Sequence, residues 1–286
     1  MGTIEPQRSR LARCLHTLLP LGACAAGSFL MPILAMGLVG ELPDDLESDD
    51  FHAAVYSTMA RMVFGNELVL LGVVAVGYFV TFQVLGPRTP RPKYRLARSD
   101  FLLLVLAGLA VGAALQILSA GVRGRAPLAN ITLSPFEDAP LQTAAWLLLV
   151  MVVIGPAIEE ICFRGYAQGE LQRFWGPVVA IGLSSLAFVA MHRSVERIPS
   201  LMFGSIILGT FAWISGSIAT SIILHASWNS LFFLVPALHV PETDAEGWTM
   251  TLGLLALGTP ALVVSLNRMT RWRRWVPVAT PPPAKP

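Results

Sequence analysis

The sequence predicts an all-α protein, a polytopic membrane helical bundle of about eight transmembrane helices. Of its 286 residues, 54% are hydrophobic and only 13% are charged, well below the roughly 25% of an average soluble domain. Apolar stretches of about 20 residues, enough to cross roughly 30 Å of hydrocarbon, recur along the whole chain. We therefore expect membrane lipid around the protein and no nucleic acid as a partner.

The apolar stretches define the expected elements. In chain order the predicted spans are 14–40, 68–86, 101–120, 141–160, 177–192, 198–214, 217–236 and 249–267. The connections are too short for a soluble domain. We expect an N-terminal segment 1–13, a single transmembrane domain 14–267 with its core at about 141–236, and a basic, proline-rich tail 268–286. Gly108 and Gly112 form a GxxxG, which is typical of close helix contacts.

The arginines are distributed unevenly between the two sides of the predicted bundle. Most lie in 1–13, 87–100 and the tail, whereas the stretch 41–50 on the opposite side is acidic. The positive-inside rule then places both termini in the cytoplasm. The arginine-rich, lysine-poor composition is typical of a GC-rich bacterial genome, so we expect a bacterial cell membrane.

The cysteines predict no disulfide framework and no cysteine zinc site, because Cys14, Cys24 and Cys162 are scattered. Residues 1–24 have the outline of a lipoprotein signal that ends at Cys24. The apolar run continues past Cys24, which favours a retained first span. Processing would remove one crossing and invert the topology.

The first cluster of polar residues inside an apolar stretch is "GPAIEEICFRG", residues 155–165. Ionisable groups in a span cost about 2.5 to 3.5 kcal/mol each, so they mark functional sites by default. Glu160 and Arg164 are i,i+4 neighbours and are expected to pair, while Glu159 points about 100° away. Pro156 is expected to kink the helix and to open a polar cavity beside the acids.

Two further clusters follow at the same helical spacing. Phe188 and His192 lie one turn apart, as do His225 and Asn229 in the seventh predicted span. An interfacial histidine is the plain alternative for His192, and a hydrogen-bonded helix contact is the alternative for His225 and Asn229. If the chain turns near Gly176, an antiparallel hairpin brings Glu159 and His192 level, which requires the fourth helix to continue to about Arg173.

These residue types suit hydrolysis. Glu159 and His192 can deprotonate a water molecule, and His225 with Asn229 can donate hydrogen bonds to an oxyanion. No GxSxG and no HExxH motif is present. One carboxylate and two histidines can also bind zinc, which leaves a zinc-dependent membrane protease as an alternative.

The three motifs, EExxxR at Glu159, FxxxH at Phe188 and HxxxN at His225, resemble those of the CPBP family of intramembrane glutamic endopeptidases. This family includes type II CAAX prenyl proteases and Abi-like proteins. The resemblance implies an eight-helix fold and metal-free peptide-bond cleavage, with Glu159 and His192 activating water. It further implies an oxyanion hole of His225 and Asn229, and supporting roles for Glu160, Arg164 and Phe188.

The resemblance does not name the substrate, which we expect to be a membrane-associated or C-terminal peptide or a membrane protein. In a bacterium, prenylated proteins are not the expected substrates. Two other classes stay open: a non-catalytic immunity or scaffold protein of the same fold, and a transporter in which the buried acids relay protons.

Overall fold

The computed structural model describes residues 14–15, 17–28, 30, 49–85, 92–123, 141–238 and 243–275. Within these ranges the chain is helical apart from short connections and contains no strand, which confirms the predicted all-α class. Three predicted segments lie outside the described residues: 1–13, most of the second half of the first predicted span, and the proline-rich end of the tail.

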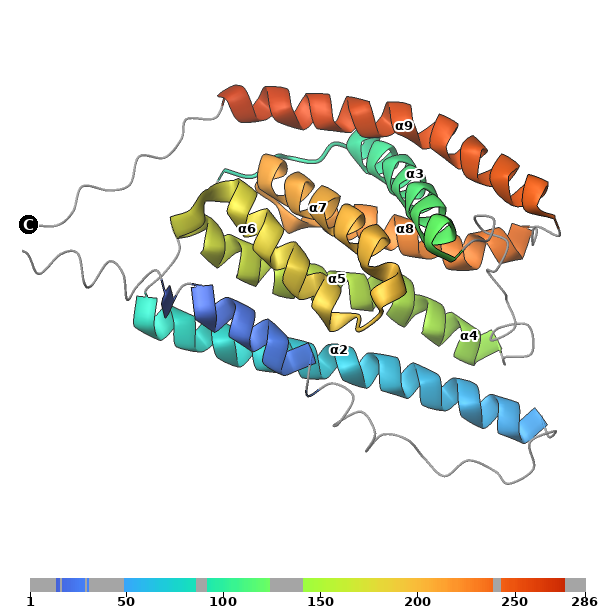
Figure 1. The fold of residues 1–286 in the computed structure, drawn as a ribbon, viewed down its shortest axis with the longest axis horizontal. Helices are drawn as coiled ribbons and strands as arrows, with labels where there is room; N and C mark the ends of the chain where they lie inside the picture. The colour runs from blue at the N-terminus through green and yellow to red at the C-terminus, as the bar shows by residue number, and fades with distance from the viewer. Residues whose placement is uncertain are drawn as a thin grey trace, which may run out of the picture.

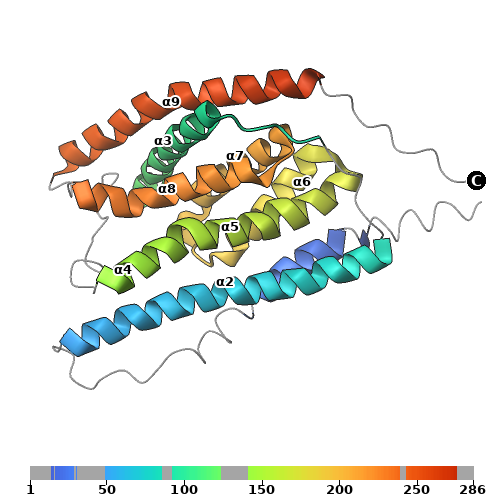
Figure 2. The ribbon, with the colours of Figure 1, turned by 180° about the vertical axis from the view of Figure 1, so that it is seen from behind.

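The helices surround the central segment of the chain. Figures 1 and 2 show α2 along one side of the bundle and α9 along the opposite side, with α5 and α8 between them. A shorter apolar helix, Thr17–Ser28, precedes α2. The elements are α2 (Asp49–Leu85), α3 (Arg98–Arg123), α4 (Leu141–Leu148), η2 (Leu149–Ile154), α5 (Gly155–Glu160), η3 (Ile161–Gln168), α6 (Gly169–Met191), η4 (Val195–Arg197), α7 (Ile198–Ser215), α8 (Ile218–Leu238) and α9 (Asp244–Trp275).

The described residues contain five stretches that are long and apolar enough to cross a membrane, so the predicted count of about eight is approximate. The helix α8 additionally occupies the predicted span 217–236. The five stretches are Arg61–Gln83, Arg98–Ser119, Leu141–Met191, Val195–Ser215 and Asp244–Arg274.

The stretch Leu141–Met191 forms a helical hairpin. Helical structure continues without a break from Leu141 to Trp175, and the chain leaves the helix at Gly176, where φ is 71° and ψ is 175°. The rest of α6 packs back against η3. The predicted end of this span at residue 160 is therefore wrong, and the predicted turn near Gly176 is confirmed. At 1.5 Å per residue the first arm is about 50 Å long, with Glu159 near its middle.

Pro156 is accommodated by a change of helix type. The preceding turn, Leu149–Ile154, is a π-helix, in which the N–H of Gly155 donates to the carbonyl of Val150. Ile154 and Gly155 keep right-handed helical dihedral angles. The expected kink thus takes the form of a π-helical stretch. Such stretches are frequent at functional sites, because they re-aim the side chains that follow them.

Among the described residues the bundle contains two large apolar cores and a third, smaller cluster around Leu231. One joins the Thr17–Ser28 helix, α2 and the hairpin, and the other joins α3, α7, α8 and α9. The GxxxG of α3 brings α8 into the second core: a Cβ at Gly108 would lie 2.6 Å from the Cβ of Ser227, and one at Gly112 would lie 2.5 Å from Leu231. This close approach sets the position of α8 relative to the hairpin.

Candidate active site

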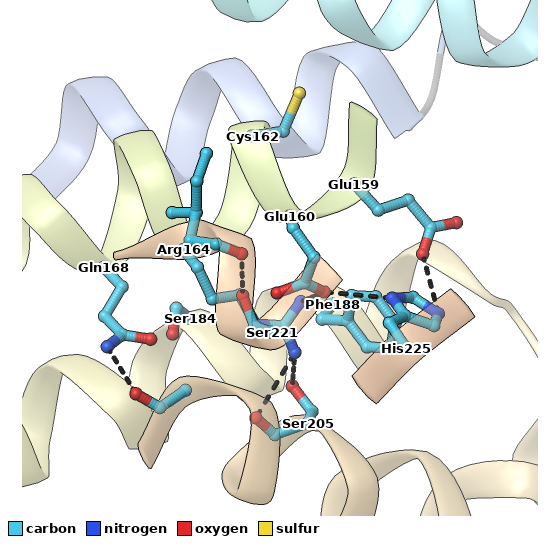
Figure 3. Close-up of polar contacts among 12 residues, drawn as sticks. Glu159, Glu160, Cys162, Arg164, Gln168, Ser184, Phe188, Ser205, Ser221 and His225 are labelled. Atoms are coloured by element: carbon cyan, nitrogen blue, oxygen red, sulfur yellow. Dashed lines mark hydrogen bonds and ion pairs between the residues drawn. The ribbon is translucent and has the colours of Figure 1, made fainter. Parts of the chain in front are cut away.

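A buried ion pair anchors the site within the first arm of the hairpin. Nη1 of Arg164 lies 3.0 Å from Oε1 of Glu160, and both side chains are almost fully buried. Nη2 of Arg164 donates to Oγ of Ser205 on α7 at 2.8 Å. Figure 3 shows Arg164 and Gln168 reaching from the hairpin toward α7. The hydrogen bond to Ser205 ties the hairpin to α7, and breaking the buried ion pair itself typically costs about 3 to 5 kcal/mol.

His225 lies between the two glutamates (Figure 3). Its Nδ1 is 3.0 Å from Oε1 of Glu160, and its Nε2 is 3.7 Å from Oε2 of Glu159. Because an ionised carboxylate only accepts hydrogen bonds, Nδ1 carries a proton and donates to Glu160. Glu160 therefore sets the orientation of the ring and directs Nε2 toward Glu159.

Phe188 forms the apolar support of these polar groups. Its ring lies under the guanidinium of Arg164, with Cζ 4.5 Å from the ring centroid. The same ring stands edge-on to Phe163 and His225 and packs 4.6 Å from the ring of His192, measured between centroids. One fully buried phenyl group therefore contacts both histidines and the arginine.

A cavity of about 440 Å³ opens beside this cluster. The residues on its wall come from α3, from both arms of the hairpin, from the η4 region, from the start of α7 and from α8. Its lining comprises Gly112, Leu115, Gln116, Ser119, Met151, Glu159, Phe188, His192, Ser194, Glu196, Arg197, Ser200, Leu201, His225, Trp228 and Asn229.

His192 and Asn229, the two remaining predicted site residues, lie on this wall, and each makes one polar contact with a backbone carbonyl. Nδ1 of His192 lies 2.9 Å from the carbonyl of Phe188. If that nitrogen carries the proton, Nε2 is left as an acceptor. Nδ2 of Asn229 donates to the carbonyl of Met151 at 3.0 Å. An amide group has two hydrogens, so one of them remains for a second acceptor.

The structure thus brings Glu159, His192, His225 and Asn229 to one cavity. The predicted pairing of Glu160 with Arg164 is present, and the contact of Glu160 with His225 is additional to it. The catalytic roles of these residues stay predictions.

Sequence reasoning missed several residues at this site. Ser205 and the cavity residues of α3 and η4 carry no motif that could have marked them. Glu67 on α2 did carry a signal, because it is an acid in an apolar run, yet the predicted span began one residue after it. The span Arg61–Gln83 includes Glu67, which is 6% exposed. Its carboxyl interacts electrostatically with Glu159.

Within the described ranges, no group of three histidine, cysteine, aspartate or glutamate side chains is arranged to hold a metal ion.

Fold and site together define a class: a helical membrane protein with a carboxylate and histidine cavity between apolar helices. Residues 141–231 match the family model of "Type II CAAX prenyl endopeptidase Rce1-like" proteins, which confirms the predicted family resemblance over this part of the chain. The matched segment covers 91 of the 286 residues and includes Glu159, His192, His225 and Asn229. Comparisons with curated proteins and with solved structures gave no match.

Proposed function

We propose that this protein is an intramembrane endopeptidase of the glutamic type, which cleaves a peptide bond with a water molecule activated by Glu159 and His192. The observation that carries the proposal is the common cavity, where Glu159 meets His225 and where His192 and Asn229 share the wall. A carboxylate and two imidazoles beside a peptide-sized space are the groups that general-base hydrolysis needs.

The proposed reaction begins with water between Glu159 and His192. Glu159 takes one proton, the oxygen of the water bonds to the carbonyl carbon of the peptide, and the carbonyl oxygen becomes an oxyanion. The free amide hydrogen of Asn229 and Nε2 of His225 stabilise this charge; because Nδ1 already donates to Glu160, His225 acts here as the doubly protonated imidazolium. Glu159 then returns its proton to the nitrogen of the peptide as the C–N bond breaks.

We further propose that the reaction proceeds without a metal ion. The support is that no group of three histidine, cysteine, aspartate or glutamate side chains among the described residues is arranged to hold a metal ion. Each step above moves only protons and the electron pairs of water and peptide.

The proposed substrate is a membrane-associated or C-terminal peptide segment. Apolar side chains such as Leu115 and Trp228 line the cavity together with polar groups such as Gln116 and Arg197, which suits an amphipathic peptide. We also propose a bacterial cell membrane with both termini in the cytoplasm, on the strength of the arginine distribution.

The test is cleavage of a quenched fluorescent peptide library by the purified protein in detergent. Glu159→Gln and His192→Ala should each lower kcat about a hundredfold or more, the usual contribution of a general base. Glu170→Gln is the control, because Glu170 is a buried acid that pairs with Arg173 at 3.2 Å outside the cavity. Cleavage by Glu159→Gln and His192→Ala at the wild-type rate would show the mechanism to be wrong.

A further inference from the structure

Glu67 is a second buried acid beside the proposed general base. It lies in the membrane span of α2, outside the segment that matches the family model. It is 6% exposed, and its Oε2 has no hydrogen-bond partner among the described residues. One turn further along α2, Leu70 is fully buried in the apolar core. Burying a carboxyl group in such surroundings costs free energy, and buried groups of this kind mark functional sites by default.

The carboxyl of Glu67 faces the helix that carries Glu159. A Cβ at Gly155 would lie 3.6 Å from Oε1 of Glu67, so this acid sits against the helix at its glycine. Gly155 and Glu159 are four residues apart in α5 and share a face. If both were ionised, Glu67 and Glu159 would repel each other, which disfavours two negative charges at this place.

The three carboxyl groups Glu67, Glu159 and Glu160 differ in their partners. Glu160 has Arg164 at 3.0 Å, and Glu159 has Nε2 of His225 at 3.7 Å. None of the ion pairs of the described residues involves Glu67. The other titratable or charged groups near Glu67 and Glu159 are Cys24, Cys162, His192 and Arg197.

A carboxylate with no cation in an apolar setting is unstable, whereas a neutral carboxylic acid is a good hydrogen-bond donor. We propose that Glu67 keeps its proton and donates it in a hydrogen bond to Glu159, directly or through one water molecule. The two acids then hold one proton between them, and Glu67 is a positioning residue for the base. This inference rests on the proposed function for its catalytic meaning.

The hydrogen bond has a defined effect on the reaction. It stabilises Glu159 as the carboxylate, which is the form that accepts a proton from water. It also holds the Glu159 side chain at the cavity wall beside His225. Glu67 itself touches neither the attacking water nor the substrate, and its proton is not consumed in the cycle.

The first test is independent of turnover. Infrared spectra of the purified protein at neutral pH should contain the carbonyl band of a protonated carboxyl group. We expect Glu67→Gln to remove the band, whereas Glu159→Gln should shift it and keep it, and Glu170→Gln should leave it unchanged. A band that survives Glu67→Gln and disappears in Glu159→Gln would place the proton on Glu159 and overturn the proposal.

The second test is the pH dependence of kcat/KM. With the donor weakened, Glu159 ionises less readily, so Glu67→Gln should move the acid limb of the profile upward by about half to one pH unit. Glu67→Leu, which has no donor, should move it further. We expect kcat to fall about tenfold in Glu67→Gln and KM to change less than twofold.

The sign of the shift decides between two interactions. If Glu67 were ionised, its removal would relieve repulsion and move the acid limb downward, which would overturn the proposal. A lower Tm with an unmoved profile would also overturn it, because Glu67 would then be structural only. If the wild-type protein cleaves no peptide, the proposed function fails, and the infrared bands still decide where the proton resides.

Discussion

Oε1 of Glu160 lies 3.0 Å from Nδ1 of His225, so a glutamate of the hairpin orients a histidine of α8. The same oxygen lies 3.0 Å from Nη1 of Arg164, which supplies the compensating charge. Glu160 thereby connects the arginine of its own helix with the histidine of another helix. Glu159, the next residue in the chain, meets the opposite nitrogen of the same ring.

Removing Glu160 should reduce both stability and activity. Glu160→Leu leaves Arg164 buried without its partner, and we expect a loss of about 3 to 5 kcal/mol. The double variant Glu160→Leu with Arg164→Met removes both charges and should recover most of the lost Tm. Peptide cleavage should stay at least tenfold below wild type in both variants, because His225 has lost the acceptor for its Nδ1. Full recovery of cleavage in the double variant would contradict the orienting role.

The contact of α3 with α8 should be sensitive to a single methyl group. A Cβ at Gly108 would lie 2.6 Å from the Cβ of Ser227 and 2.7 Å from the carbonyl of Leu224. We expect Gly108→Ala to cost about 1 to 3 kcal/mol and to lower cleavage, since α8 carries His225. Thermal unfolding in detergent measures the first effect.

Gly72→Ala is the matched control, because a Cβ at Gly72 would meet no atom of the described residues within 4 Å beyond its own helix backbone and chain neighbours. Alanine favours a helix by about 0.5 to 1 kcal/mol over glycine, so this variant should be as stable as wild type or slightly more stable. Equal Tm values for the Gly108 and Gly72 variants would rule out the close contact.

Loss of the Phe188 ring should disturb the cluster that it supports. Phe188 is fully buried against Arg164, His192 and His225. We expect Phe188→Ala to destabilise the protein by about 3 kcal/mol and to lower kcat more than it changes KM. Phe203→Ala serves for comparison, because Phe203 is 43% exposed and is expected to contribute little. Equal effects of the two substitutions would exclude a special role for Phe188.

Treatment with a strong chelator separates the glutamic mechanism from the zinc alternative. The purified protein should retain its full kcat after prolonged dialysis against chelator, because the proposed steps involve only side chains, water and peptide. The measurement is peptide cleavage before and after treatment, with metal analysis of the same samples. Loss of activity that returns on addition of zinc would favour a metal-dependent protease.

Local spacing was sufficient to predict the pairing of Glu160 with Arg164. Residues at i and i+4 of one helix must be neighbours wherever the helix lies, so this contact follows from the order of residues alone. The same reasoning applied to the hairpin, since Gly176 lies about equally far from Glu159 and His192. The helix boundaries were harder to predict, because the π-helical turns and the polar part of the first arm break the apolar pattern.

The sequence by itself determined the membrane class, the helical fold and the residues that bring charge into apolar segments, because composition and local spacing are properties of the chain. Only the tertiary structure decided that Glu160 holds His225 and that Glu67 lies against Gly155. These contacts join residues far apart in the chain, and they depend on how closely α2, α8 and the hairpin approach. The GxxxG of α3 predicts a close contact, but only the folded chain shows that α8 is its partner, because a local pattern does not say which helix packs against it.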